Sequence, residues 1–378
     1  MCERVPVADV AWLRGLQVVE VTTGVAAPLI GRVLGELGAE VVKVESRAKI
    51  DVNRARLPRP TDPEGYPASE AFQLLHEANA GKRSVTLNLK TADGVALLRT
   101  LLADADVLIE NFVPGWLERL GLSVEGLLEE FPRLVIVSAS GYGQTGPSRT
   151  QRAYAPVMTS LAGVEGLIGY ADGEVVGCSA LALADLNCSF HGVFLTLAAL
   201  HGRRATGRGR HVDISQTEAC VAMIGEAFVG RQLGLDEPAP RGNTDPDGRP
   251  WSLLPAAGED RWVAARTVAE PAVNGGRPDR AELVARLRER GIEAAPVLTP
   301  AEVATDEGYA ARAFLQRVPH PEPLISEVTV TSVPWRLDGA VPRVRAAAPR
   351  LGEADDEVYG RHLTPARRAE LEREGVFR

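Results

Sequence analysis

The stretch that decides the fold reads Gln17-Val-Val-Glu-Val-Thr-Thr-Gly-Val-Ala-Ala-Pro-Leu-Ile-Gly-Arg-Val-Leu-Gly-Glu-Leu-Gly-Ala-Glu-Val-Val-Lys-Val-Glu45. Its first seven residues are rich in β-branched side chains, which predicts a strand. From Leu29 to Leu37 apolar residues recur every three or four positions, which predicts a helix that Gly38 ends. Residues 40–45 predict a second strand. A strand, a helix and a strand within about 30 residues form a βαβ unit of a parallel sheet.

The residues that follow repeat this alternation. Strands are expected at 84–89, 106–110 and 134–138, and helices are expected at 91–103, where Thr91 is the cap, and at 124–130. Strands that alternate with helices build α/β folds. The sequence therefore predicts an α/β chain with a large doubly wound, Rossmann-like domain around a parallel sheet.

The second half of the chain predicts a smaller domain after a linker. A long apolar helix is expected at 185–202, a short strand at 211–214 and a helix at 215–230. Residues 235–250 are rich in Pro, Gly, Asp and Arg, as linkers are. We therefore expect a large domain formed by residues 1–225 and 330–378, a linker at 226–250, and a small, shortened α/β domain at 251–329.

Charge and composition exclude several classes of protein. The 378 residues carry 42 Lys+Arg against 50 Asp+Glu, a net charge of −8, whereas a nucleic-acid-binding surface has to be basic. No apolar run approaches the roughly 18 residues that a membrane span needs, and the first residues do not resemble a secretory leader. The four cysteines show neither a C-x-x-C pair nor zinc spacing. We expect a cytoplasmic protein without a metal site.

All four lysines lie in the first quarter of the chain, at positions 43, 49, 82 and 90, whereas the other 38 basic residues are arginines. One interpretation is a bias of the whole sequence towards arginine together with chance clustering. The other is an anion-binding site in that quarter, because a polyanion bound by an acidic protein requires local positive charge. The sequence leaves both open.

Gly141-Tyr-Gly-Gln-Thr-Gly146 matches the G-x-G-x-x-G pattern and follows an expected strand. That pattern binds a dinucleotide only where the last glycine opens a helix. Here Pro147-Ser-Arg-Thr-Gln-Arg152 follows, without helical periodicity. We therefore favour a plain loop over a nicotinamide site.

Asp185 is the carboxylate of greatest interest, since it lies at the start of an otherwise apolar helix, in Leu181-Ala-Leu-Ala-Asp-Leu-Asn-Cys188. A leading Asp is most often a helix cap. A helix N-terminus also favours the ionised form, which a nucleophilic carboxylate needs. Cys188 in the same helix is better explained by packing.

Taken together, several motifs resemble the class III CoA-transferases, the family of formyl-CoA and carnitine CoA-transferases that also contains the α-methylacyl-CoA racemases. The resemblance is strong over residues 15–220 and weaker over 258–358. The matching stretches are Ala26–Pro28, Leu37–Glu45, Lys82–Lys90, Asp106–Gly115, Glu118–Gly121, Ser140–Pro147, Ala184–Asp185, Thr206–Asp213 and Ala348–Glu353.

The resemblance implies an acyl-CoA:carboxylate CoA-transferase in which Asp185 carries an aspartyl-CoA thioester. It implies acyl-CoA and a carboxylic acid as substrates, coenzyme A as a substrate with no tightly bound cofactor, and a homodimer of interlocked rings. It also implies a set of residues that bind CoA: Arg47, Lys82, Arg83, Lys90, Asn111, Phe112, Arg119, Arg152 and Tyr154.

Two departures from the family pattern leave an alternative open. Ala155 follows Tyr154 where relatives carry an acid, and the racemases carry a proton-transferring histidine at the position of Tyr154. The stretch 267–280 is also too short for the helices that relatives carry there. The alternative is a divergent acyl-CoA-binding protein, or a racemase-like or lyase-like acyl-CoA enzyme, without transferase activity.

Overall fold

The computed structural model describes residues 5–55, 62, 64–152, 154–178, 182–235, 239–245, 247–266 and 276–378. The chain forms two compact units. The first comprises Met1–Leu161, Ala180–Met223 and Ala310–Arg378, and the second comprises Ala162–Ser179 and Ile224–Tyr309. Compared with the boundaries expected from the sequence, this division assigns 162–179 to the second unit and 310–329 to the first.

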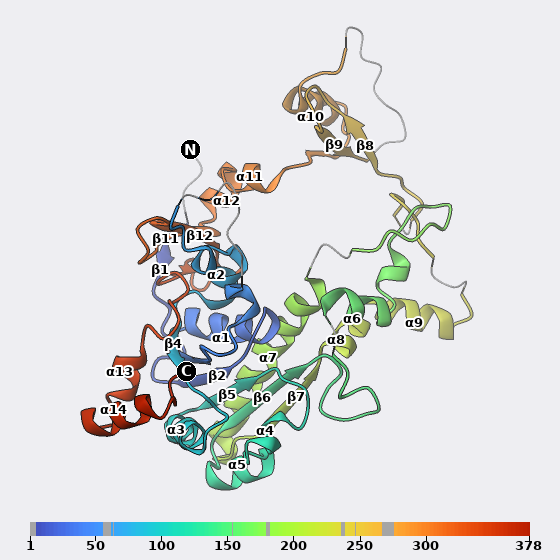
Figure 1. Ribbon diagram of the computed structural model, residues 1–378. Coiled ribbons are helices and arrows are strands. Elements are labelled where there is room, and N and C mark those ends of the chain that lie inside the picture. Colours follow the sequence, from blue (N-terminus) through green and yellow to red (C-terminus); the bar gives the residue numbers. More distant parts are fainter. Residues whose placement is uncertain are drawn as a thin grey trace. The chain divides into compact units, whose positions relative to one another are not determined.

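A six-stranded, fully parallel sheet forms the centre of the first unit (Figure 1). Its strands lie in the order β4 (Arg83–Thr86), β3 (Glu40–Glu45), β2 (Gln17–Val21), β5 (Val107–Glu110), β6 (Val135–Ser140), β7 (His211–Ser215). The chain runs outward from β2 to β4, then returns to β5 and runs outward to β7. This reversal confirms the doubly wound fold, and it places the topological switch point between β2 and β5.

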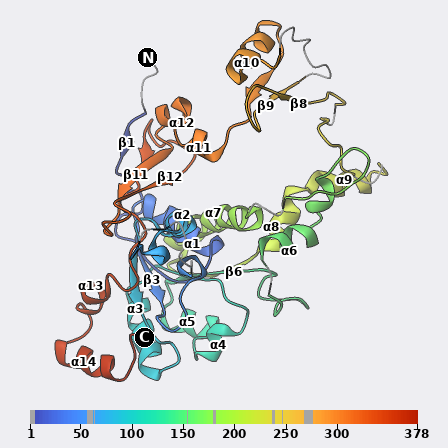
Figure 2. The same ribbon diagram turned by 45° about the horizontal axis from the view of Figure 1, so that its top comes forward.

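Helices cover both faces of the sheet (Figure 2). On one face, α1 (Ala26–Glu36) and α7 (Leu183–Thr206) pack in one buried apolar cluster with alternate strand residues. On the other face, α3 (Ala92–Ala103) and α5 (Val124–Glu130) pack against the remaining strand residues. The strands read as apolar runs because both of their faces are buried.

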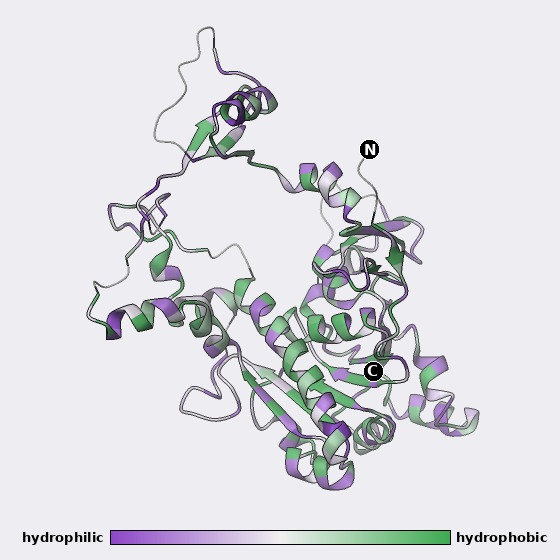
Figure 3. Cartoon of the chain, turned by 180° about the vertical axis from the view of Figure 1, so that it is seen from behind, coloured by the Kyte–Doolittle hydropathy of each residue, from purple (hydrophilic) through white to green (hydrophobic). Residues whose placement is uncertain are grey.

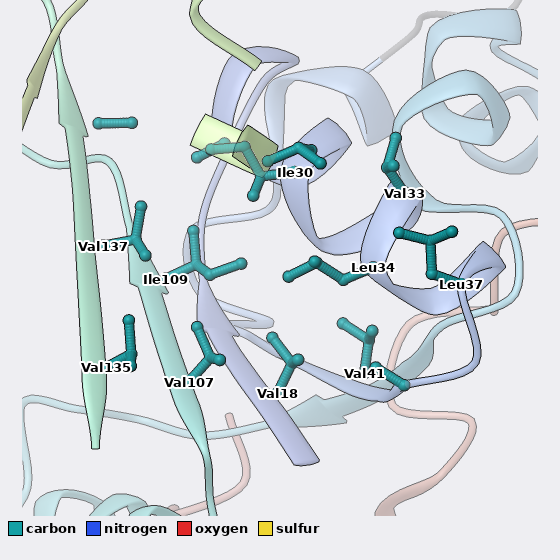
Figure 4. Packing of buried hydrophobic residues seen from close by; sticks show 14 of the residues in the cluster. Val18, Ile30, Val33, Leu34, Leu37, Val41, Val107, Ile109, Val135 and Val137 are labelled. Carbon is teal, nitrogen blue, oxygen red and sulfur yellow. The ribbon is translucent and has the colours of Figure 1, made fainter. Parts of the chain in front are cut away.

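The packing of α1 shows how the opening stretch of sequence forms the core (Figure 4). Ile30 and Leu34 of α1 point towards the sheet, where Val18 and Ile109 belong to neighbouring strands. All four side chains are almost completely buried. Figure 3 shows the same apolar character along the strands of the sheet.

The long helix α7 has 24 residues and, by length and composition alone, could span a membrane. The sequence had predicted no apolar run of that length. In the structure, Val193, Ala199 and Leu200 of α7 belong to the buried cluster shared with α1 and the sheet. A core helix of a globular domain passes the same test, and one such helix is weak evidence for a membrane span.

The remaining elements of the first unit surround this sheet. They are β1 (Val7–Ala8), η1 (Val52–Arg54), η2 (Ala68–Glu70), α2 (Gln73–Asn79), α4 (Trp116–Arg119), α6 (Ala155–Leu161), α8 (Gln216–Met223), β11 (Leu315–Pro319), β12 (Glu327–Thr331), β13 (Val341–Pro342), α13 (Asp355–Tyr359) and α14 (Pro365–Arg373). Strands β11 and β12 form an antiparallel pair, and β1 pairs with β13.

The second unit has its own small core. A helix, α10 (Arg280–Glu289), packs against an antiparallel sheet of order β10-β9-β8, whose strands are Ala294–Pro296, Trp262–Ala265 and Ser252–Pro255. The buried residues of this core include Leu254, Val263, Leu283 and Leu287. Its elements are η3 (Glu165–Leu167), α9 (Gly225–Gln232), β8 (Ser252–Pro255), β9 (Trp262–Ala265), α10 (Arg280–Glu289), β10 (Ala294–Pro296) and α11 (Pro300–Val303), with α12 (Glu307–Ala311) at the boundary. The expected helix at 215–230 is interrupted at Ile224 and forms α8 and α9.

Candidate functional site

Several of the expected ligand-binding residues lie at the carboxyl edge of the sheet, near the switch point. Arg47 follows β3, Lys90 follows β4 and Asn111 directly follows β5. In doubly wound sheets, ligands bind in the crevice outside the carboxyl ends of the strands at the switch point. Here the switch point lies between β2 and β5.

The loop that follows β2 is held on two sides by side-chain amides and a carboxylate. Asn111 Nδ2 donates to the Thr23 carbonyl at 2.8 Å, and Asn111 Oδ1 accepts from the Thr23 amide at 3.0 Å. On the other side, Asp51 Oδ1 accepts from the Gly24 amide at 3.2 Å, and Asn53 Nδ2 donates to the Gly24 carbonyl at 2.7 Å. Because these bonds satisfy the polar backbone of the loop, they fix its conformation.

Asp185 is attached to the same loop through the backbone of α7. It is the third residue of the helix, which begins at Leu183. One turn later, Ser189 Oγ lies 2.7 Å from the carbonyl oxygens of both Ala26 and Asp185. Since Ala26 begins α1 directly after the β2 loop, this hydroxyl holds the start of α7 against the start of α1.

The carboxylate of Asp185 makes no hydrogen bond or ion pair with any residue in the described part of the chain. Ala182, not Asp185, occupies the cap position of α7, and no side chain caps the helix there. Burial raises the pKa of Asp185 to about 6. Most of the group is still ionised at pH 7, as a nucleophilic carboxylate requires.

An aromatic pair lies beside the end of β5. The rings of Phe112 and Trp116 are stacked with their centroids 4.2 Å apart. Arg119, at the end of α4, is exposed and forms no ion pair with a described residue. An apolar ring surface next to a free guanidinium suits an aromatic base that carries phosphate.

Three further residues of the expected CoA-binding set are exposed. Lys90 lies in the turn before α3, and its side chain has no partner among the described residues. Arg152 and Tyr154 precede α6, and Tyr154 is 77% exposed. Among the described residues, these three side chains form no hydrogen bond or ion pair with one another or with Asp185, so their common role stays a prediction.

Lys82 lies in the protein interior instead of facing a ligand. Its Nζ donates to Glu20 Oε1 at 2.7 Å, to the Pro28 carbonyl at 2.6 Å and to Asn79 Oδ1 at 3.1 Å. All three hydrogens of the ammonium group are thus used within the fold. Burial lowers the pKa of Lys82 to about 8, while the charge of Glu20 opposes that change.

Lys43 completes this buried ionic cluster, which we define as Glu20, Lys43, Asp51 and Lys82. Lys43 Nζ lies 3.2 Å from Asp51 Oδ2 and 3.6 Å from Glu20 Oε1. Burial alone would lower the pKa of Lys43, but the carboxylates of Asp51 and Glu20 reverse the change and raise it. Two of the four clustered lysines therefore serve the fold, which corrects the interpretation that they form an anion site.

Arg83 is also placed away from the other expected ligands. It is the first residue of β4, so it lies at the amino end of that strand. Its guanidinium pairs with Glu40 and Glu357, each at 3.3 Å. We conclude that Arg83 belongs to a surface ion-pair group and not to the carboxyl-edge site.

Arg47 lines a cavity of about 460 Å³ beside the C-terminal residues. It lies 3.4 Å from Asp355, and Phe377 and Arg378 also line the cavity. Asp185 lines neither this cavity nor one of about 500 Å³ at the amino edge of the sheet.

The glycine-rich segment after β6 does not have the geometry of a dinucleotide loop. No helix begins between Gly141 and Arg152, all of which the structure describes. Instead, the Gly141 carbonyl accepts from Thr217, and the Gln144 amide donates to the carboxylate of Asp213. The segment is tied to β7 and α8, and the helix N-terminus that would face a pyrophosphate is missing.

Sequence reasoning missed the supporting residues Ser189 and Thr23, because their partners are remote in sequence. It also missed Glu110, the last residue of β5. Glu110 Oε2 accepts from the Phe112 amide at 2.9 Å, and burial raises the pKa of Glu110 to about 7. Among the described residues, no group of His, Cys, Asp or Glu is placed to hold a metal ion.

The sequence matches the model of CoA-transferase family III over residues 13–275 and 275–355. The chain belongs to this family. Family members to which it is similar include the succinate–glutarate CoA-transferase of Agrobacterium fabrum, at 32% identity over 65% of this chain and 61% of that one. The formyl-CoA:oxalate CoA-transferase of Streptomyces coelicolor is 28% identical over 92% of this chain and 94% of that one.

The succinyl-CoA–L-malate CoA-transferase beta subunit of Chloroflexus aurantiacus is 38% identical, but the match spans 55% of this chain and 49% of that one. Thus some relatives are matched over only half to three fifths of their length. Among solved structures, a CaiB/BaiF family protein from Brucella suis is similar with a TM-score of 0.80, at 27% identity over 94% of this chain and 100% of that one. The CoA-transferase family III membership and the Rossmann-like α/β fold agree with the resemblance seen in the sequence.

Proposed function

We propose that this CoA-transferase family III protein moves coenzyme A from an acyl-CoA to a carboxylic acid, with Asp185 as the nucleophile. The observation that carries the proposal is a carboxylate without a partner among the described residues, held at the start of α7 beside the switch-point loop. A half-buried carboxylate without a partner lowers the free energy of unfolding, because it loses hydration without gaining a hydrogen bond. Such groups are typical of sites where the carboxylate takes part in a reaction.

The proposed reaction consists of paired acyl exchanges. Asp185 Oδ attacks the thioester carbonyl of the donor, the carbon–sulfur bond breaks, and CoA thiolate leaves. The thiolate then attacks Cγ of Asp185 in the mixed anhydride, which releases the donor acid and forms the aspartyl-CoA thioester. The acceptor carboxylate attacks this thioester, and the released thiolate finally attacks the acceptor acyl carbon, which frees Asp185.

We propose that the CoA contacts come from the residues whose side chains are exposed or line a cavity. Arg119, Arg152 and Lys90 are exposed cations with no partner among the described residues, and Arg47 lines a cavity. Phe112 and Tyr154 supply aromatic surface. In this proposal Lys82 and Arg83 act in the fold, and Asn111 supports the loop next to the reacting group.

We further propose that the enzyme works as a cytoplasmic homodimer and that the second copy completes the site. The outer side of α7 carries Leu186, Phe190 and Phe194, which are 43%, 45% and 68% exposed. These residues lie four apart on one helical stripe, and they begin directly after Asp185. Large exposed apolar patches of this kind mark interaction surfaces.

Trapping of the covalent intermediate tests the proposal. The protein is incubated with succinyl-CoA, acetyl-CoA or formyl-CoA and then treated with hydroxylamine, which converts an acylated Asp185 into a hydroxamate that peptide mass spectrometry locates. Asp185→Ala should abolish the adduct and reduce turnover at least about 10³-fold. Asp93→Asn, a carboxylate change in the first turn of α3, is the matched control and should leave both unchanged.

The alternative of a divergent acyl-CoA binder rests on Ala155, which begins α6 and is buried where relatives carry an acid. Residues 267–275 of the shortened stretch lie outside the described residues, and the two segments matched by the family model meet at residue 275. Tight acyl-CoA binding with neither an Asp185 adduct nor exchange across a panel of carboxylic acids would favour this alternative and overturn the transferase proposal.

A further inference from the structure

A cavity of about 500 Å³ lies at the amino edge of the sheet, at the opposite end of α7 from Asp185. It is lined by residues of three separate segments: Trp12 and Arg14 before β2, Arg133 before β6, and His201, Arg203 and Arg204 in the last turns of α7. From Asp185 to His201 the helix rises about 24 Å, at about 1.5 Å per residue. The cavity is therefore separate from the carboxyl-edge site.

The charge of this cavity is opposite to that of the chain. Four guanidinium groups line it and no carboxylate does, although the net charge of the protein is −8. Arg203 is buried and forms part of the wall, because its guanidinium pairs with Asp106 at 2.7 Å and donates to the Arg133 carbonyl at 2.9 Å. The guanidinium groups of Arg14, Arg133 and Arg204 have no partner among the described residues.

Stabilisation of the C-terminus of α7 explains only two of the four arginines that line the cavity. Arg203 and Arg204 lie in the last turn of α7, where cations interact favourably with the helix dipole. Arg14 and Arg133 lie outside the helices, in loops that precede two different strands. Their convergence on one cavity with unpaired guanidinium groups indicates a ligand with several negative charges.

We propose that this cavity binds a nucleoside diphosphate or triphosphate, with its phosphates on Arg14, Arg133 and Arg204 and its base on Trp12. Arginine forks match phosphate oxygens in pairs. Trp12 is 60% exposed at the cavity, and an exposed indole ring is a stacking surface for a base. The volume lies within the range of small-molecule sites. The proposal is independent of the transferase activity.

Calorimetric titration of the full-length protein with ADP, ATP and inorganic pyrophosphate tests the site. Both nucleotides are expected to bind. The double variant Arg14→Gln/Arg133→Gln should weaken all three ligands about tenfold or more. Trp12→Ala should weaken ADP at least about fivefold and leave pyrophosphate unchanged, since only the base contacts the ring.

Two control variants locate the bound nucleotide. Arg345→Gln, at an exposed arginine outside the cavity, should leave ADP affinity unchanged. Arg119→Gln should do the same, because Arg119 belongs to the carboxyl-edge site. Loss of ADP binding in Arg119→Gln would place the nucleotide in the proposed CoA site and overturn the inference. The inference would also fail if ADP did not bind at millimolar concentration, or if the double variant altered only the oligomeric state.

Discussion

The buried ionic cluster and Asp185 lie on the same side of the sheet, next to the same loop. They differ in whether the charged groups have partners of opposite charge. In the cluster, Lys82 and Lys43 form buried ion pairs with Glu20 and Asp51. Asp185 has no such partner among the described residues, and burial shifts its pKa upward. We infer that the paired charges of the buried ionic cluster stabilise the fold, whereas the unpaired carboxylate of Asp185 is available to react.

Removing one partner from the buried ionic cluster should have the largest effect on stability. Lys82→Met keeps the length of the side chain and leaves Glu20 with a single cation, so we expect a loss of about 3 kcal/mol or more in the free energy of unfolding. Urea unfolding followed by circular dichroism measures this. The matched control is Arg83→Met, whose partly exposed ion pairs should contribute less than about 1 kcal/mol. Equal losses of unfolding free energy in the two variants would contradict the claim that the buried ionic cluster stabilises the fold more than the surface ion pairs do.

The pH dependence of the rate should follow the ionisation of Asp185, the carboxylate without a partner among the described residues. Because the nucleophile must be ionised and the pKa of Asp185 is about 6, turnover should rise about tenfold from pH 5 to pH 7 and then level off. The measurement is kcat/KM for the acyl-CoA donor, in the presence of a fixed acceptor whose carboxyl groups are already ionised at pH 5. A kcat/KM profile that is flat over this range would contradict the assignment of Asp185 as the titrating nucleophile.

The smallest expected effect is a gain in stability from removing the charge of Asp185. Its folded-state pKa of about 6 lies above the ordinary value of 3.8, so ionisation destabilises the folded state as the pH rises from about 4 to 6. Asp185→Asn should therefore raise the free energy of unfolding by about 1 kcal/mol at pH 7.5, and by much less at pH 4.5. A variant that is less stable than the natural protein at pH 7.5 would reveal a stabilising partner for the carboxylate.

Much of the fold could be predicted because it depends on local pattern. The strand 40–45 and the helix 124–130 have the predicted bounds. Helix α1 begins at Ala26, three residues earlier than predicted, because the first turn of a helix tolerates Pro28. The interruption at Ile224 was missed, since apolar residues continue on both sides of it.

The site was less predictable because it depends on contacts between remote residues. Asn111 could be placed at a strand end from sequence, and Asp185 at a helix start. The role of Lys82 could not be read in this way, because its partner Glu20 lies 62 positions away and only strand pairing brings them together. The amino-edge cavity was not predicted for the same reason, since its arginines come from three separate segments.

The hydroxyl of Ser189 has a mechanical consequence for substrate binding. It anchors the first turn of α7 to a loop that Asn111 and Asp51 already immobilise. The backbone next to Asp185 is thus held by side chains from three separate segments of the chain. If Asp185 is the nucleophile, as proposed, we expect the adjustments that align the two reactants to come mainly from the incoming thioester and from segments outside this hydrogen-bonded framework.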